Sequence, residues 1–545
     1  MVDINTQDFL DEIRFDIKEN DLIKARAVFS FFGDVDEKTQ KQALSELQKT
    51  DDAFAVPLFV GILANTPDLT KSFETLKEAL FSRLLRNSQV LLSLLEKEEK
   101  AWDRAFLVKI AGEIRLEEAV PALLQILNSE TDDKTIKSTI DTLGLLGDPI
   151  TCSPVSEYLY TDNMELIMAA IRTLGQLGTP TAVQRLAEKI GSDTDLDLMV
   201  LDVLADIQSP EALEKLNDVL GSHYVHIRTT AKQKLLEIGP KAVPFLIRNL
   251  LHDDPDLLIP SLNVLGDIGD KAAITSIRNL IHNEPKDPNV RFAAYETLGR
   301  LPMQKGAYIL AAGLEDPVAN VRSAAAKAID KNFDLALAAG MKNLTMSGDS
   351  GAMEIIFTII NSQCGNIFLG LIKEDFFIEP VFKYLADKAH PDIRLYFTKL
   401  LVENGYHDLS QQLTGEKGVK ADTRLKVFAV DDSKMILNIY KSMLHNLGYE
   451  PEVFEFPAKA LEQVQREKPH LIFTDLNMPD ITGIEFSKGV RRLYNKEDLP
   501  IIMVTTQNEA QDNQAAYSAG VNNILYKPFS EDDIGKALSD LKIGE

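Results

Sequence analysis

Apolar residues recur along the first three-quarters of the chain with a period of about 31 residues, a length typical of repeat proteins. Short segments such as DTLGLLGDP and RTLGQLGTP place a leucine at the same point of each period. These leucines are Leu143, Leu174, Leu204, Leu235, Leu265 and Leu298, and Ala111 and Ile329 continue the series in weaker copies. A sustained period of this kind predicts one structural unit repeated many times.

Each unit contains two helical stretches. The first ends in a sequence of the type Gly-x-Leu-Gly-x-Pro, which stops a helix and makes a turn. The second, as in Ala119–Leu127 and Ala242–Leu250, has a proline near its start, where a helix does not need an amide donor. A single helical hairpin cannot bury its apolar face, so the units are expected to stack into a solenoid.

These units resemble HEAT-like repeats, especially the short type found in phycobilisome-lyase-like proteins. The resemblance covers residues 101–335. Residues 1–100 are expected to form a helical N-terminal cap or degenerate repeats, and residues 336–410 helical C-terminal repeats or a cap. Residues 411–424 are polar and without periodicity, which indicates a linker.

An arginine recurs after short acidic loops in several repeats. These arginines are Arg228, Arg291, Arg322 and Arg394. They could bind phosphate, but the position after an acidic loop favours ion pairs that brace neighbouring repeats.

The pattern changes after residue 424. Short apolar runs, typical of buried strands, alternate with amphipathic helical stretches such as Lys434–Leu447. The expected strands are Leu425–Val430, Pro451–Phe456, His470–Thr474, Pro500–Val504 and Asn523–Tyr526. Alternating strands and helices predict a parallel sheet with helices on both faces. The fold class is therefore multidomain: an all-α HEAT-like solenoid, then an α/β doubly wound domain with a five-stranded parallel sheet.

Polar residues stand where these strands end. They are Asp431, Asp432, Asp475, Thr505 and Lys527. The carboxyl ends of parallel strands share one edge of a sheet, which is where ligands bind in such folds. Three carboxylates packed together must recruit a cation or take up protons. An all-oxygen, strongly anionic site suits Mg²⁺.

This set of residues resembles the receiver domain of two-component response regulators, of the flavodoxin-like, chemotaxis type, over residues 425–545. The resemblance implies that Asp475 accepts a phosphoryl group from a sensor histidine kinase or a phosphotransfer protein. It implies that Asp431, Asp432, Asp475 and the backbone carbonyl of Asn477 hold Mg²⁺ or Mn²⁺. Thr505 and Lys527 would stabilise the phosphoryl group.

The resemblance also assigns residues that regulate the site. Asn477 and Gln507 occupy positions that tune the lifetime of the phosphorylated state. The switch position, three residues before Lys527, usually holds an aromatic residue, but this chain has Ile524 there and Tyr526 directly before the lysine. No conventional enzymatic activity is expected beyond the receiver's own phosphorylation and autodephosphorylation.

Composition and charge limit the possible partners and the cellular location of the protein. A net charge of −25 argues against nucleic acid and anionic membrane surfaces as partners. No segment approaches the roughly 20 apolar residues of a membrane span. The start of the chain is polar and acidic, unlike a secretory signal. Cys152 and Cys364 lack the spacing of a metal site or a disulfide framework. A cytoplasmic protein is expected, and the resemblance suggests a bacterial one.

The sequence therefore predicts phosphorelay signal transduction in which the receiver modulates protein–protein interaction by the HEAT-like scaffold, whose protein partner is unknown. Two alternatives remain open. The repeat array could be a cofactor-handling or lyase-like enzyme, or the receiver could be a phosphate sink without output.

Overall fold

The computed structural model describes residues 6–65, 70–97, 104–222, 224–303, 308–414, 424–478, 481–506 and 510–541. By their internal contacts the residues form two units. One comprises Met1–Val219 with Tyr224–Lys234, and the other Leu220–His223 with Leu235–Glu545.

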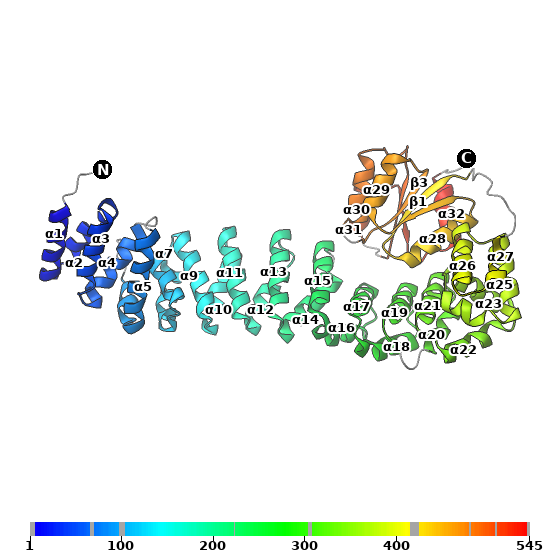
Figure 1. The fold of residues 1–545 in the computed structure, drawn as a ribbon, viewed down its shortest axis with the longest axis horizontal. Helices are drawn as coiled ribbons and strands as arrows, with labels where there is room; N and C mark the ends of the chain where they lie inside the picture. The colour runs from blue at the N-terminus through cyan, green and yellow to red at the C-terminus, as the bar shows by residue number, and fades with distance from the viewer. Residues whose placement is uncertain are drawn as a thin grey trace. The chain divides into compact units, whose positions relative to one another are not determined.

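The first unit is built from helices that follow one another as antiparallel pairs (Figure 1). Its helices are α1 (Thr6–Glu19), α2 (Leu22–Phe29), α3 (Glu37–Leu47), α4 (Asp52–Asn65), α5 (Thr70–Arg86), α6 (Gln89–Leu95), α7 (Arg104–Glu113), α8 (Val120–Ser129), α9 (Asp133–Leu146), α10 (Cys152–Ser156), α11 (Met164–Leu177), α12 (Pro180–Ala187), α13 (Thr194–Ile207) and α14 (Pro210–Asp218). Helix α15 (Val225–Ile238) spans the division between the units.

The second unit begins with further helical repeats. They contain α16 (Val243–Asn249), α17 (Pro255–Ile268), α18 (Ile274–His282), α19 (Pro288–Arg300), α20 (Ile309–Ala312), α21 (Ala319–Lys331), α22 (Leu335–Thr345), α23 (Ser350–Asn361), α24 (Gly365–Leu371), α25 (Asp375–Asp387), α26 (Pro391–Glu403) and α27 (His407–Thr414). Helix α27 continues to Thr414, past residue 411, where the linker was expected to begin. Residues 415–423 lie outside the described part of the chain.

The periodic leucines form the core of the repeats, as the sequence predicts. All six are fully buried, and so are Ala111 and Ile329. Where the first helix of a repeat ends in glycine, that residue takes the left-handed conformation that closes the helix, as at Gly147 and Gly269, with φ of 73° and 75°. Pro180 and Pro210 begin the following helices, α12 and α14.

Threonines just before these leucines tie neighbouring repeats together. Thr142 donates to the carbonyl of Val108 at 3.2 Å, and Thr173 does the same to Ile140 at 3.0 Å. The equivalent bond in the second unit joins Thr297 to Leu262 at 2.9 Å. Each bond satisfies a buried hydroxyl and fixes the register of one repeat on the next.

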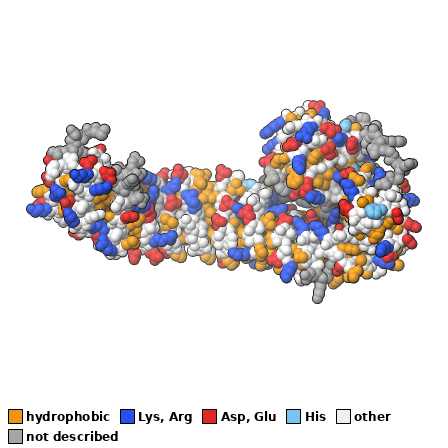
Figure 2. Space-filling model, viewed as in Figure 1, with side chains coloured by type: hydrophobic (Ala, Val, Ile, Leu, Met, Phe, Trp, Pro, Cys, Tyr) orange, Lys and Arg blue, Asp and Glu red, His pale blue; other side chains and the backbone are white. Residues whose placement is uncertain are grey.

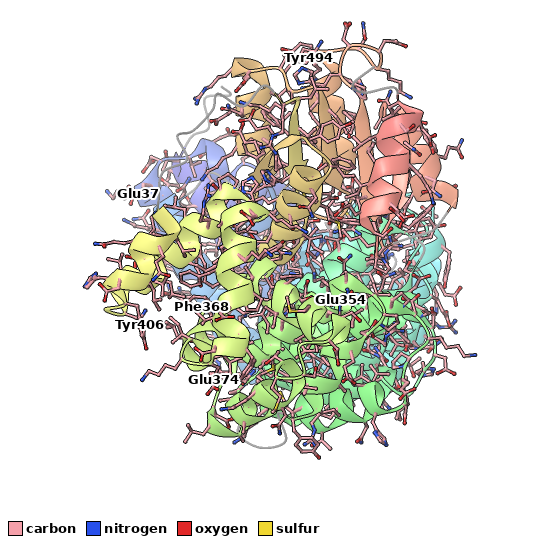
Figure 3. All side chains as sticks on the ribbon, turned by 90° about the vertical axis from the view of Figure 1, so that its right-hand side faces the viewer. Glu37, Glu354, Phe368, Glu374, Tyr406 and Tyr494 are labelled. Atoms are coloured by element: carbon pink, nitrogen blue, oxygen red, sulfur yellow. The ribbon has the colours of Figure 1, made fainter. Side chains whose placement is uncertain are left out.

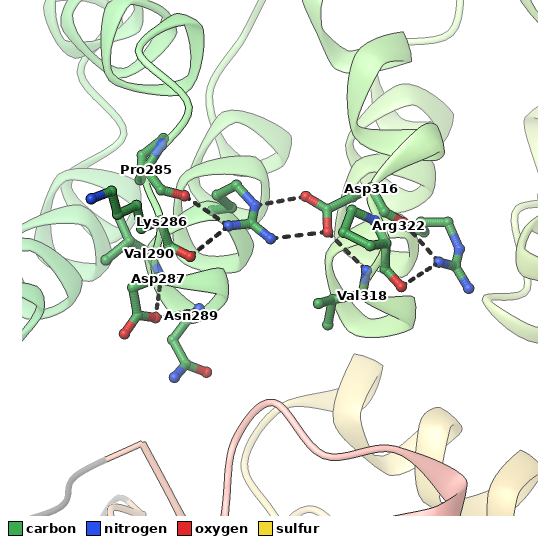
Figure 4. A network of polar contacts seen from close by, with 10 residues as sticks. Pro285, Lys286, Asp287, Asn289, Val290, Asp316, Val318 and Arg322 are labelled. Carbon is green, nitrogen blue, oxygen red and sulfur yellow. Dashed lines mark hydrogen bonds and ion pairs between the residues drawn. The ribbon is translucent and has the colours of Figure 1, made fainter.

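The recurring arginines add ion pairs to these contacts (Figure 4). Arg291 holds both carboxylate oxygens of Asp316, at 2.7 and 3.2 Å, and also donates to the carbonyls of Pro285 and Lys286. Arg322 donates to one carboxylate oxygen of Glu354, which Figure 3 labels, and to the carbonyls of Asp316 and Pro317. The expected bracing is confirmed for these two arginines; within the described residues Arg394 forms no ion pair.

Aromatic packing holds the last repeats together. Phe368, labelled in Figure 3, is fully buried, with its ring centre 4.6 Å from that of Phe397 and 6.3 Å from that of Phe377. Cys364 is buried beside it, and both cysteines are free.

The C-terminal part of the second unit is the predicted α/β domain. Its elements are β1 (Lys426–Val430), α28 (Lys434–Asn446), β2 (Glu450–Phe454), α29 (Pro457–Arg466), β3 (Leu471–Asp475), α30 (Gly483–Arg491), β4 (Ile501–Thr505), α31 (Ala510–Ser518), β5 (Asn523–Tyr526) and α32 (Glu531–Asp540). The described strands form one parallel sheet in the order β2-β1-β3-β4-β5. The fold class is confirmed.

Charged side chains of both signs are mixed on the surface of the repeats. On the face drawn in Figure 2, acidic and basic side chains are interspersed along the helices. None of the helices in the described part of the chain combines the length and the apolar character that a membrane crossing requires.

We expect Arg291→Ala to lower the free energy of unfolding by about 2–4 kcal/mol, because it leaves the nearly buried Asp316 carboxylate without its cation. Urea denaturation of the full chain measures the change. Lys342→Ala is the control: Lys342 also joins two repeats through Glu374, but it is half-exposed, so its loss should cost no more than about 1 kcal/mol. Equal losses in the two variants would contradict the proposed bracing.

Candidate functional site

The strand ends place four side chains at one edge of the sheet. Asp431 directly follows β1, Asp475 is the last residue of β3, Thr505 is the last residue of β4, and Lys527 directly follows β5. The parallel registers pair Val430 with Thr474, Asp475 with Val504 and Thr505 with Tyr526. The sheet therefore brings these residues to the same level, as the sequence predicts.

Lys527 joins two of the acids. Its Nζ lies 2.6 Å from an oxygen of Asp431 and 3.0 Å from an oxygen of Asp475. The Asp431 side chain is fully buried, and those of Asp475 and Lys527 are nearly so. The other oxygen of Asp431 accepts the backbone N–H of Ser433 at 2.9 Å.

Asp432 completes a group of three carboxylates. Oxygens of Asp431, Asp432 and Asp475 all lie within 4.8 Å of one another. Asp432 is exposed, so the cluster is open to solvent on its side and closed on the side of Asp431. One lysine does not balance three carboxylates, and the site keeps a net negative charge.

The excess of negative charge affects the protonation of Asp475 and Lys527. Burial raises the pKa of Asp475 to about 7; Lys527 lowers this pKa, and the negative charge of Asp431 raises it. Burial alone would lower the pKa of Lys527, but the neighbouring charges of Asp431 and Asp475 outweigh it and raise that pKa above its usual value. Lys527 is therefore a cation, and Asp475 binds a proton readily when no other cation is present.

The donor set fits a hard divalent cation. Three carboxylates converge, and all the available ligand atoms are oxygens, which is the chemistry that Mg²⁺ and Mn²⁺ select. Asn477, exposed just beyond β3, offers a backbone carbonyl in the same loop.

The remaining expected residues have different surroundings. Thr505 is buried at the end of β4, next to the strand that carries Asp475. Ile524, on β5, packs against the apolar core of the α/β domain and is partly buried. Tyr526 is partly exposed, and its hydroxyl accepts a hydrogen bond from Asn513 at 2.8 Å. Gln507 lies outside the described residues.

Sequence reasoning missed two residues that shape the site. Gly483 begins α30 so close to β3 that an added Cβ would overlap the carbonyl oxygen of Asp475. Tyr440, on α28, is fully buried, stacks on Phe529 with ring centres 5.1 Å apart, and has its pKa raised well above the usual value by burial. Glycine directly after the helix-capping Thr482 was the available signal for the first; the second had none beyond its place on an amphipathic helix.

Comparison with known proteins divides the chain in the same way. The family model of the response regulator receiver domain matches residues 427–539, and the model of HEAT repeats matches residues 123–198 and 254–330. The match to HEAT repeats does not confirm the phycobilisome-lyase type in particular.

Three similar proteins illustrate the receiver match. A chemotaxis protein CheY homolog of Campylobacter jejuni is 36% identical over 119 residues, which are 22% of this chain and 92% of that protein. Chemotaxis protein CheY1 of Helicobacter pylori is 36% identical over 108 residues, 19% of this chain and 87% of that protein. Among solved structures, Vibrio cholerae chemotaxis protein CheY4, crystallised at pH 4.0, has 34% sequence identity to this chain. The match covers 22% of this chain and 99% of the CheY4 chain, with a TM-score of 0.21.

The segment that matches the receiver model contains the described strands of the sheet, apart from the first residue of β1, and the acids and lysine at its edge. The match covers 92% of the Campylobacter protein, and the HEAT repeats precede the matched segment in this chain. The chain belongs to the response-regulator receiver family, with its CheY-like receiver domain carried behind an array of HEAT repeats.

Proposed function

We propose that Asp475 is the phosphoryl acceptor of a phosphorelay and that the repeats carry the output. The observation that supports this most directly is the convergence of three carboxylates within 4.8 Å, with Lys527 bridging Asp431 and Asp475. A buried acid beside a lysine, with two further acids that can hold a divalent cation, is suited to attack an anionic phosphoryl group.

The transfer is a simple exchange of bonds. An oxygen of the ionised Asp475 attacks phosphorus, the new O–P bond forms, and the P–N bond of phosphohistidine breaks. The imidazole nitrogen leaves with the bonding electron pair. In later hydrolysis, the oxygen of water forms a new O–P bond, the O–P bond to Asp475 breaks, and the carboxylate leaves with the electron pair. The products are inorganic phosphate and a proton released to solvent.

The neighbouring residues place and neutralise the transferred group. Lys527 already lies 3.0 Å from Asp475, so its ammonium group can pair with a phosphoryl oxygen there. Thr505, at the end of the next strand, supplies a hydroxyl donor. Asp431, Asp432, Asp475 and the carbonyl of Asn477 would hold Mg²⁺ or Mn²⁺, which when bound neutralises charge on the transferring oxygens.

The lifetime of the phosphorylated state is assigned to two positions beside the acceptor. Asn477 follows Asp475 by two residues and is exposed, so its side chain can govern the approach of water. Gln507 is the second position. This assignment rests on the receiver resemblance.

The phosphodonor is a sensor histidine kinase or a phosphotransfer protein, and the setting is the cytoplasm of a bacterium. The output is binding of a protein by the repeats, because stacked helical repeats present long surfaces for partners. The receiver can influence the repeats directly, since α28 lies against α21 and α23.

Asp475→Asn should abolish labelling of the full chain by ³²P-acetyl phosphate with Mg²⁺, because the amide is not a nucleophile for phosphorus. EDTA should abolish labelling of the wild type. Acid–urea electrophoresis or autoradiography provides the measurement.

The matched control for this experiment is Asp498→Asn, which alters an exposed acid of the same domain. It should be labelled like the wild type. A wild type that stays unlabelled, or an Asp475→Asn variant that is labelled to the same extent as the wild type, would exclude the proposed acceptor.

Metal-free Asp475→Asn protein should be more stable than wild type near neutral pH. The folded-state pKa of Asp475, about 7, lies above the usual 3.8, so its contribution to stability is complete below pH 3.8 and is lost as the pH rises through about 7. Asparagine does not titrate, so the variant does not lose this stability. Its free energy of unfolding should exceed that of the wild type by an amount that grows over that pH range to at most about 4 kcal/mol.

Calorimetry of the metal-free full chain between about pH 4 and pH 8 tests this dependence. Asp498→Asn should follow the wild-type curve. An advantage of Asp475→Asn that does not vary with pH would show that the buried charge is not its cause.

Beryllofluoride with Mg²⁺, a stable phosphoryl mimic, should change hydrogen exchange in α21 and α23, because both helices contact α28. The change should be absent in Asp475→Asn. Exchange that changes in the receiver alone would instead favour a phosphate sink without output.

A further inference from the structure

A pocket opens beside the acid cluster, with one wall from the receiver and one from the repeats. Its volume is about 490 Å³. The receiver contributes Asp432, Ser433, Lys434 and Glu455, and the repeats contribute residues of α19 and α21. Asp432 is the member of the acid cluster that lines the pocket, and one of its carboxylate oxygens lies within 4.8 Å of one of Asp475, the proposed acceptor.

Contacts along α28 hold the two walls in place. Nζ of Lys441 lies 2.7 Å from a carboxylate oxygen of Asp392 on α26. The rings of His445 and His390 meet edge to face with their centres 4.7 Å apart. Helix α28 begins three residues after Asp431, so these contacts also fix the repeats relative to the acid cluster.

The repeat wall presents positive charge to the pocket. Its cations are Arg300 on α19 and Lys327 and Lys331 on α21. Arg300 is engaged, since it lies 2.6 Å from Asp267. Within the described residues, neither Lys327 nor Lys331 has an acidic partner within ion-pair distance.

The acids of the pocket do not cancel this charge. Glu455 pairs with Lys434 at 3.4 Å, and Glu296 lies 3.9 Å from Arg300. Glu296 and Asp432 line the same pocket, and burial raises the pKa of Glu296, Arg300 lowers it and the charge of Asp432 raises it. The two lysines therefore line the same pocket as Asp432, one acid of the cluster, and they leave positive charge there for a small anion.

We propose that Lys327 and Lys331 belong to the phosphoryl-accepting site as specificity-determining residues that draw an anionic phosphodonor toward Asp475. The inference rests on the proposed function and adds a part of the site that lies outside the receiver. A volume of about 490 Å³ is that of a small-molecule pocket. The phosphodonor that the two lysines attract is therefore a small acyl phosphate, since a folded protein does not fit in the pocket.

The reaction with such a donor balances without a further reagent. The ionised Asp475 forms the new O–P bond, the P–O bond to the acyl group breaks, and the acyl oxygen leaves as a carboxylate. The lysines take no part in these bonds. They raise the local concentration of the anion, an effect that salt screens.

The test measures initial labelling rates of the full chain with ³²P-acetyl phosphate and Mg²⁺, over a range of donor and salt concentrations. Lys327→Gln with Lys331→Gln should lower the rate at limiting donor by about 3- to 10-fold at low salt and leave the maximal rate unchanged. Lys327→Arg with Lys331→Arg should restore the wild-type rate, because it keeps both charges.

Lys383→Gln with Lys388→Gln is the matched control. It removes the same charge from exposed positions at α25 that do not line the pocket, so its rate should equal the wild-type rate. High salt should narrow the difference between the pocket variant and this control.

Two results would overturn the inference while leaving the acceptor in place: equal rates for the pocket variant and the control, or a loss that is independent of salt or appears in the maximal rate. A wild-type chain that is not labelled at all would overturn the proposed function itself. The two failures are therefore distinguishable.

Discussion

The chemistry at the edge of the sheet depends on one shared cation. Lys527 serves Asp431 and Asp475 together, at 2.6 and 3.0 Å, in a place where water cannot stabilise either carboxylate. Burying an ion costs several kcal/mol unless it is paired, and a single lysine cannot compensate three acids. The remaining negative charge is the physical reason to propose a divalent cation at Asp432 and a phosphoryl group on Asp475. The parallel sheet makes this arrangement unavoidable, because it brings the ends of β1, β3 and β5 to one edge.

Much of this could be predicted because the information is local. A buried strand is a short apolar run, and the residue after it stands at the sheet edge whatever the rest of the fold does. Asp431, Asp475 and Lys527 needed only that rule. The repeats could be predicted equally well, since a leucine that recurs about every 31 residues must face the same core in every stacked unit. Boundaries were less accurate: helix α27 extends to Thr414, because Leu413 near its end is buried although the segment as a whole is polar.

Other features could not be predicted, because they depend on residues that are distant in the chain. Gly483 is needed because α30 begins against the carbonyl of Asp475, and only the folded backbone shows how little space remains there. Tyr440 lies beneath the site through packing on Phe529, almost ninety residues later in the sequence. No sequence motif distinguishes Lys327 and Lys331 from the other charged residues of the repeat helices. Their position opposite Asp432 joins two segments whose sequences share no pattern.

The placement of Lys327 and Lys331 in the same pocket as Asp432 suggests how a receiver without the usual aromatic switch residue could influence the repeats. Ile524 packs into the apolar core, so a rotation of this side chain would carry no charge or hydrogen bond to the surface. A phosphoryl group, by contrast, adds roughly −1.5 to −2 units of charge at Asp475. This charge would appear within a few ångströms of Asp432, which lines the pocket that Lys327 and Lys331 also line. The free energy that links the two parts of the protein can then come from direct attraction across the pocket. It requires only that the lysines experience a different charge before and after phosphorylation, which is the differential interaction that any ligand-driven switch must have.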